Sequence, residues 1–193
     1  MGRRPSDKRE KILATASELF AARSFQDVKL DLVAEKAGVA KGTIYLSFKS
    51  KEDLFCECLL HDTPDWYHRI EGIIAENDSA TARLRKLVDL QADAYARKGP
   101  LIQQMIQMCP TFPVSTEIIT RLHDHLRQIV ELDSRLFQQG IDAGEFPGPF
   151  TALQMAIIFI QIFDLNVKFQ MFRVSLLQPE DVHTALLKLF GHP

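Results

Sequence analysis

The chain has 193 residues, of which 46% are hydrophobic and 25% are charged, and its formal net charge is −2. This length accommodates one domain, or a small domain followed by a larger one. Three cysteines are too few for a disulfide framework, and polar residues interrupt the longest apolar stretch, residues 155–167. These features argue against a disulfide-stabilised secreted protein and against a membrane span, and they favour the cytoplasm.

Charge is distributed unevenly along the chain. Residues 1–55 contain 11 Lys and Arg against 8 Asp and Glu, a net charge of +3, whereas residues 56–193 contain 12 against 17, a net charge of −5. A basic N-terminal part on an acidic body suits DNA contact at one end only. Residues 1–10 are charged and no apolar run follows them, so we expect no signal peptide.

The N-terminal residues predict a helix and a loop. Residues 2–5 form a short basic arm, which either reaches DNA or is a disordered tail. Ser6 is a suitable capping residue for the first helix. Residues 24–27 are predicted to form the connecting loop.

Two short helical patterns joined by a tight turn follow this loop. Residues 30–37 place apolar side chains at helical spacing. Gly38 can adopt the left-handed backbone conformation that lets a chain leave one helix and enter the next within a few residues. A second helix, residues 40–48, would send Ile44 and Phe48 inward. The pattern predicts a helix-turn-helix.

The outer face of the second helix has the composition of a DNA-reading surface. Small residues permit close approach, hydroxyl groups and a lysine can contact phosphates and bases, and carboxylates are absent from this face. Its residues are Lys41, Gly42, Thr43, Tyr45, Leu46 and Ser47. A helix-turn-helix that served only for packing would leave these side chains without a purpose.

The motif AxxAGVxKGTxYxxFxSKxxL, residues 34–54, resembles the DNA-binding motif of the TetR family of bacterial repressors. Turn, core and surface positions match together over about the first third of the chain, whereas the remainder shares only the family's size and helical character. The resemblance implies an all-α fold. A three-helix DNA-binding domain, residues 1–50, would precede a larger helical ligand-binding and dimerisation domain, residues 51–193.

The resemblance also implies roles for individual residues. Phe25 would plug the three-helix core, and Tyr45 and Lys51 would contact the DNA backbone. The complete set of expected DNA-binding residues is Lys29, Lys41, Gly42, Thr43, Tyr45, Leu46, Ser47 and Lys51.

This chain departs from the family pattern at three places. Ala40 stands where the family usually has a capping Ser, and Lys29 stands where it often has Thr. The two motif helices are therefore expected to start without a side-chain cap, at a cost of about 1 kcal/mol each. Leu46 and Ser47 replace a bulkier polar or aromatic pair, so the operator sequence does not carry over.

The body is predicted to be helical throughout. Ser50 caps a helix that runs to His61, and Thr63 caps the next. Later helices are predicted over residues 80–98, 101–109, 118–141, 151–173 and 179–190, with Gly99 and Pro100 ending the first of these. Apolar stripes follow two of the helices, but Gln91, Tyr95 and Asp133 lie within them.

The last two helices are the expected dimer interface. Residues 151–173 are apolar on most sides, as befits a helix packed on its own domain and on a second subunit. The resemblance implies that this segment, residues 150–173, and residues 179–190 pair with their copies in a homodimer. Asp164 has two interpretations: a local ion pair with Lys168, or a counter-charge for a cationic ligand.

Phenylalanine and methionine are concentrated in the body, which predicts an apolar, adaptable pocket or simply a packed core. The candidate ligand-binding residues are Trp66, Met105, Met108, Phe112, His123, Phe137, Phe159 and Phe163. Cys56, Cys58 and His61 suggest a metal site only superficially, since residues two apart on a helix point to different faces. No cofactor or metal is expected.

These features predict a homodimeric DNA-binding transcriptional regulator, a repressor that a small apolar effector releases from a palindromic DNA operator. An alternative is a DNA-binding or architectural protein without an effector, which a filled core in the body would favour over a cavity of several hundred Å3. An enzyme is not expected, because the sequence has no nucleophile–base constellation and no glycine-rich phosphate loop.

Overall fold

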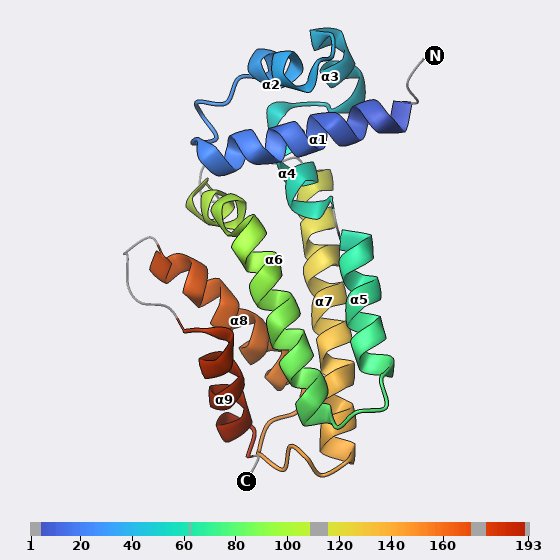
Figure 1. Cartoon of the computed structure of the whole chain (residues 1–193), viewed down its shortest axis with the longest axis vertical. Helices are drawn as coiled ribbons and strands as arrows, with labels where there is room; N and C mark the ends of the chain where they lie inside the picture. The colour runs from blue at the N-terminus through green and yellow to red at the C-terminus, as the bar shows by residue number, and fades with distance from the viewer. Residues whose placement is uncertain (1–4, 62, 109–115, 171–176, 192–193) are drawn as a thin grey trace. The chain divides into compact units, whose positions relative to one another are not determined.

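The computed structural model describes residues 5–61, 63–108, 116–170 and 177–191. Within these residues all regular structure is helical, which confirms the predicted all-α class (Figure 1). The helices are α1 (Pro5–Ala22), α2 (Leu30–Ala37), α3 (Lys41–Ser47), α4 (Lys51–Leu60), α5 (Thr63–Ala75), α6 (Ala80–Met108), α7 (Thr116–Asp142), α8 (Ala152–Gln170) and α9 (Pro179–Leu189). In the described part of the chain, none of them is long and apolar enough to cross a membrane.

The chain forms two compact units. Met1–Asp62 and Lys98–Leu122 make up the first, and Thr63–Arg97 and His123–Pro193 make up the second. Each unit therefore combines segments that are distant in the sequence. The expected functional boundary between residues 50 and 51 is a different kind of division, and it stays a prediction.

A tightly packed apolar core holds the first unit together. In it α1 packs against α2 and α4, and α2 packs against α3 (Figure 1). Phe55 lies edge-on to Phe20 and Phe25, with ring centroids 5.0 Å and 5.4 Å away. Phe25 is only 4% exposed. It fills the centre of this core, as expected.

Helix starts in the first unit match the expectations at all but one position. The Ser50 hydroxyl accepts a hydrogen bond from the Asp53 N–H at 3.0 Å, which caps α4. Lys29 and Ala40 precede α2 and α3 without a side-chain cap. The prediction that Ser6 caps α1 was wrong, because α1 begins at Pro5. Proline suits a first helical turn, where its missing N–H costs no hydrogen bond.

The predicted break at Gly99 and Pro100 was also wrong, because α6 continues through both residues to Met108. A proline inside a helix removes one hydrogen bond and costs about 3 kcal/mol. The residue after the proline offsets this cost by packing, because Leu101 is buried in the core of the first unit and only 2% exposed. Gln104 donates hydrogen bonds to the Phe20 and Arg23 carbonyls, which anchors the continued helix further.

The second unit is a bundle in which α5 and the adjoining parts of α6 and α7 run side by side, with α8 and α9 against α6 (Figure 1). Contacts between the helices support this arrangement: Tyr67 bonds His125 between α5 and α7, Tyr95 bonds Asp164 between α6 and α8, and Arg85 bonds Glu180 between α6 and α9. Aromatic rings fill the core.

Two residues cap the N-terminus of α6. The Ser79 hydroxyl accepts from the Ala82 N–H at 3.1 Å. The Glu145 carboxylate, far away in sequence, accepts from the N–H groups of Ala80 at 2.7 Å and Thr81 at 2.9 Å. Its negative charge at a helix N-terminus is favourable.

Candidate nucleic-acid interface

The turn between α2 and α3 has the geometry that a helix-turn-helix requires. Gly38 has φ of 65° and ψ of 39°, a left-handed conformation that is costly for residues with a Cβ. The N–H groups of Gly38 and Val39 bond the carbonyls of Glu35 and Ala34 at 3.1 Å and 3.0 Å. These bonds close the end of α2 and allow α3 to begin at Lys41.

Two buried side chains hold α3 in place. Ile44 is fully buried and Phe48, at the end of the helix, is 3% exposed. Consequently the opposite face points to solvent, where Leu46 is 91% exposed and Tyr45 is 54% exposed. This exposure excludes packing of Leu46 against Tyr45 or α4 in the free protein.

Lys41 forms an ion pair with Asp31 of α2. The Nζ atom of Lys41 lies 2.6 Å from a carboxylate oxygen, and both side chains are exposed. The hydrogen bond that Lys41 donates to Asp31, together with the charge of Asp31, raises the pKa of Lys41. Exposed ion pairs are weak, so Lys41 can exchange this partner for a DNA phosphate or base.

Lys51 faces the loop before α2. Its Nζ atom lies 4.3 Å from the centre of the Phe25 ring and donates to the Gln26 carbonyl at 3.3 Å. Burial lowers the pKa of Lys51. An ammonium group has three donors, so Lys51 retains donors for a phosphate while the ring and the carbonyl orient it.

The remaining expected residues lie on or beside the same face. Lys29 and Gly42 are exposed, and Thr43 and Ser47 are half-buried. The Ser47 hydroxyl donates to the Thr43 carbonyl at 3.0 Å. Its oxygen can still accept a hydrogen bond, but its proton is engaged within the helix.

Sequence reasoning did not anticipate the ionic contacts that link this module to the N-terminal part of α7. Lys49 pairs with Glu117 at 2.6 Å, and the half-buried Glu57 of α4 pairs with both Arg9 and Arg121. Burial would raise the pKa of Glu57, but the hydrogen bonds and charges of the two arginines together hold it below its ordinary value. No local sequence signal identifies such distant partners.

Cys56 and Cys58 are buried thiols. Burial raises the pKa of Cys56 to about 12 and that of Cys58 to about 11. The Cys58 thiol approaches the Leu13 carbonyl, and His61 lies 2.9 Å from Glu10 of α1. Neutral thiols are poor metal ligands and poor nucleophiles.

The candidate ligand-binding residues do not all lie together. Phe137, Phe159 and Phe163 are buried in one aromatic cluster of the second unit, with successive ring centroids 6.0 Å and 5.3 Å apart. Trp66 packs against that core, whereas His123 is exposed. Met105 packs in the first unit. Phe112 and the side chain of Met108 lie outside the described residues.

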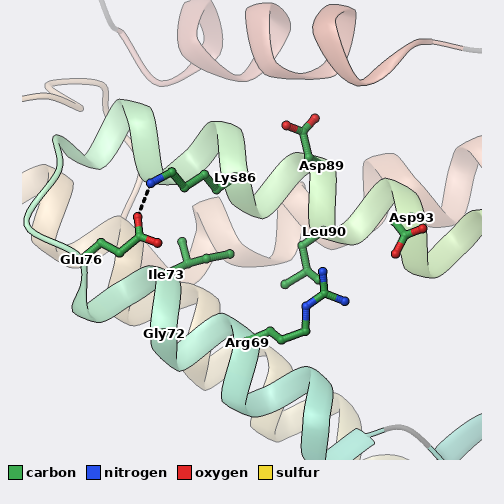
Figure 2. Close-up of a pocket in the computed structure, with 8 residues that line it drawn as sticks. All are labelled: Arg69, Gly72, Ile73, Glu76, Lys86, Asp89, Leu90 and Asp93. Carbon is green, nitrogen blue, oxygen red and sulfur yellow. Dashed lines mark hydrogen bonds and ion pairs between the residues drawn. The ribbon is translucent and has the colours of Figure 1, made fainter.

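A surface groove of about 490 Å3 runs between α5 and α6 in the second unit (Figure 2). Its lining residues are Arg69, Gly72, Ile73, Glu76, Lys86, Asp89, Leu90 and Asp93. Lys86 of α6 reaches across one end and pairs with Glu76 (Figure 2). The groove is open and mostly charged, so it is not the apolar pocket that the sequence suggested.

Several polar side chains are buried in the core of the second unit instead. Asp133 is fully buried and Gln91 is 3% exposed. Asp164, expected either to pair with Lys168 or to serve a ligand, accepts a hydrogen bond from Tyr95. The side chain of Lys168 lies outside the described residues. Polar residues within apolar helical stripes were the signal that could have identified this cluster.

A helix-turn-helix with a packed inner face and an exposed, carboxylate-free recognition helix defines a DNA-binding transcriptional regulator. Residues 12–58 match the family profile described as bacterial regulatory proteins, tetR family. This match shows that the N-terminal part of the chain has the DNA-binding domain of the TetR family of transcriptional regulators.

Two curated relatives and one solved structure illustrate the similarity. The fatty acid metabolism regulator protein of Bacillus subtilis is 25% identical over 134 residues, 69% of this chain and 68% of that protein. The transcriptional repressor KstR2 of Mycolicibacterium smegmatis is 36% identical over 87 residues, which span 45% of this chain but only 40% of KstR2. The crystal structure of Bacillus subtilis FadR in complex with stearoyl-CoA superposes with a TM-score of 0.74 at 20% identity, covering 94% of this chain and 96% of FadR.

Proposed function

We propose that the chain is a homodimeric, cytoplasmic repressor that a small apolar effector releases from a palindromic DNA operator. In this proposal residues 1–50 bind DNA, and residues 51–193 bind the effector and form the dimer. The observation that carries the proposal is the face of α3, where Leu46 is 91% exposed beside Lys41, Gly42 and Tyr45 while Ile44 is fully buried. A large apolar side chain so exposed is best explained by an apolar partner, and thymine methyl groups in the major groove supply one.

The surface of α8 supports dimerisation. Leu153, Ile157 and Leu165 are 54%, 46% and 51% exposed, and their spacing places them in one stripe along the helix. On α9, Leu189 is 43% exposed. A row of exposed leucine and isoleucine side chains is costly in water, and a second copy of the same surface would cover it. A two-fold dimer requires a palindromic operator.

The aromatic core of the second unit supports an apolar effector. Phe137, Phe159 and Phe163 form a continuous cluster that a small change in side-chain packing can open. The Bacillus subtilis FadR structure contains stearoyl-CoA, which shows that a protein of this fold holds an apolar chain. An effector releases DNA only if it binds the DNA-free conformation more tightly than the DNA-bound one.

Selection of binding sites from random duplexes with the purified full chain tests the proposal. We expect a palindrome whose half-sites lie about one helical turn, or a small multiple of it, apart. A library of small molecules is then screened for release of the selected duplex. A non-palindromic site, or a monomer on DNA, would contradict the proposal.

A further inference from the structure

Asp133 of α7 is buried without any polar partner. Its side chain has no exposed surface, and neither carboxylate oxygen has a hydrogen-bond partner. The carbonyl oxygen of Gln91 on α6, a residue 3% exposed, also lacks a partner. Unpaired polar atoms in a core are rare and costly, so their retention calls for an explanation.

Gln91 and Asp133 both lie near Tyr95 of α6, which contacts Asp164 of α8. Gln91 hydrogen-bonds Tyr95, and the Tyr95 hydroxyl donates to Asp164 of α8. Burial raises the pKa of Tyr95, and the charge and hydrogen bond of Asp164 raise it further. Polar side chains of α6 and α8 therefore meet at one place in the second unit, and Asp133 of α7 lies within electrostatic range of Tyr95.

This polar cluster is bordered by aromatic rings. The Phe163 ring lies 5.5 Å from the Tyr95 ring, and Phe159 lies 5.3 Å from Phe163. Phe137 follows Asp133 by one helical turn, on the same side of α7. The surroundings thus combine a carboxyl group with aromatic faces, which attract cations.

In the described part of the second unit, the cluster has unpaired acceptors and no cationic donor. The two oxygens of Asp133 and the carbonyl oxygen of Gln91 are three acceptor atoms without a donor. The buried cation of this unit, Arg83, donates instead to the Ile74 carbonyl at 2.7 Å and to Gln139. Among the described residues no Lys or Arg neutralises Asp133, and burial alone raises its pKa well above the ordinary value.

We infer that Asp133 and Gln91 form the polar end of the effector site and bind the protonated amine of an amphipathic ligand, whose apolar part packs on the phenylalanine rings. This inference rests on the proposed function, in which the body holds an effector. A primary ammonium has three donors, which match the three unpaired acceptors. A hydroxyl group has only one donor, and a carboxylate has none and would be repelled.

Binding must also satisfy a proton balance. Burial raises the pKa of Asp133 and favours its neutral form in the free protein, because an unpaired carboxylate ion is costly there. An alkylamine resembles Lys, with a pKa near about 10.4, and arrives as an ammonium ion. Formation of the ion pair therefore moves one proton per site from Asp133 to the solvent.

Three probes with one apolar tail test the inference: phenylbutylamine, phenylbutanol and phenylbutyrate. Titration calorimetry on the full chain, in two buffers of different ionisation enthalpy, measures affinity and proton release together. Fluorescence of Trp66, the single tryptophan of the chain, provides a second signal. We expect the amine to bind about tenfold or more tightly than the alcohol, with release of one proton per site.

Two variants test whether Asp133 causes the preference for the amine and the proton release. In Asp133→Asn the amine should lose its advantage over the alcohol and its proton release, while alcohol binding persists and reports an intact fold. Asp142→Asn makes the same amino-acid substitution at an exposed position of α7 and should behave as the wild type. Equal affinity for amine and alcohol in the wild type, absence of amine binding at millimolar concentration, or unchanged amine binding in Asp133→Asn would overturn the inference.

Release of the selected operator is measured separately with the same probes and with stearoyl-CoA. If the amine binds through Asp133 but the operator is not released, the inference stands and the proposed release mechanism falls. If phenylbutyrate or stearoyl-CoA releases the operator equally from the wild type and Asp133→Asn, while the amine does not bind, the proposed function stands and the inference falls.

Discussion

Replacement of Leu46 by alanine tests whether this residue reads DNA. The side chain is 91% exposed in the free protein, so its truncation should change the free energy of unfolding by less than about 0.5 kcal/mol. Leu→Ala removes three carbon atoms, whose complete burial would be worth about 2.4 kcal/mol at 0.8 kcal/mol each. Contact with a thymine methyl on one side covers roughly half of that surface. We therefore expect a loss of about 1 kcal/mol per subunit in operator affinity, a factor of about five.

The assay compares three proteins on two kinds of DNA. Fluorescence anisotropy measures the wild type, Leu46→Ala and the nearly isosteric Leu46→Met on the selected operator and on a duplex of unrelated sequence. Leu46→Ala should weaken operator binding and leave nonspecific binding almost unchanged, while Leu46→Met should lie close to the wild type. Each operator thymine is then replaced by uracil, which lacks only the methyl group.

One thymine should account for the effect. Its replacement by uracil should weaken the wild type about as much as Leu46→Ala does and should weaken Leu46→Ala itself hardly at all, since the two changes remove the same contact. If no uracil replacement distinguishes the two proteins, or if Leu46→Ala weakens unrelated DNA equally, Leu46 does not read a base.

Three further predictions concern charge and assembly. Lys51→Ala should weaken all DNA about equally and reduce the salt dependence of binding by about one unit per subunit, with Lys51→Arg as the control; an effect on one sequence only would mean that Lys51 reads bases. Light scattering should find the free wild type as a dimer at micromolar concentration and Ile157→Asp as a monomer, and a monomeric wild type would refute the assignment of α8. Glu57→Gln should lower the free energy of unfolding by about 1 kcal/mol near neutral pH, a value that allows for the partial exposure of its arginine partners. Because the folded-state pKa of Glu57 is lowered, its contribution is present above the unfolded-state pKa and is lost as the pH falls through the folded-state value, so wild type and variant should converge in acid. A difference in stability between the wild type and Glu57→Gln that persists in acid would show that the contribution of Glu57 is not ionic.

The DNA-binding module was largely predictable because its signals are local. The left-handed turn at Gly38, the inward positions Ile44 and Phe48, and the Ser50 cap each depend on neighbours within a few residues. Helical spacing then determines which face of α3 is exposed. The exposure of Leu46 follows from the same spacing, although sequence alone left open its packing against a neighbouring helix.

Only the tertiary structure decided the features that depend on distant partners. By itself the sequence determined an all-α chain with a helix-turn-helix, since helical periodicity and turn residues act over one or two turns. It predicted that α6 would end at Pro100, and the packing of Leu101 and Gln104 overrode that local preference. It placed Asp133 in an apolar stripe without revealing that no cation accompanies it there. Burial and pairing depend on residues that are neighbours in space but distant in the sequence. Such residues produce no periodic pattern along the chain.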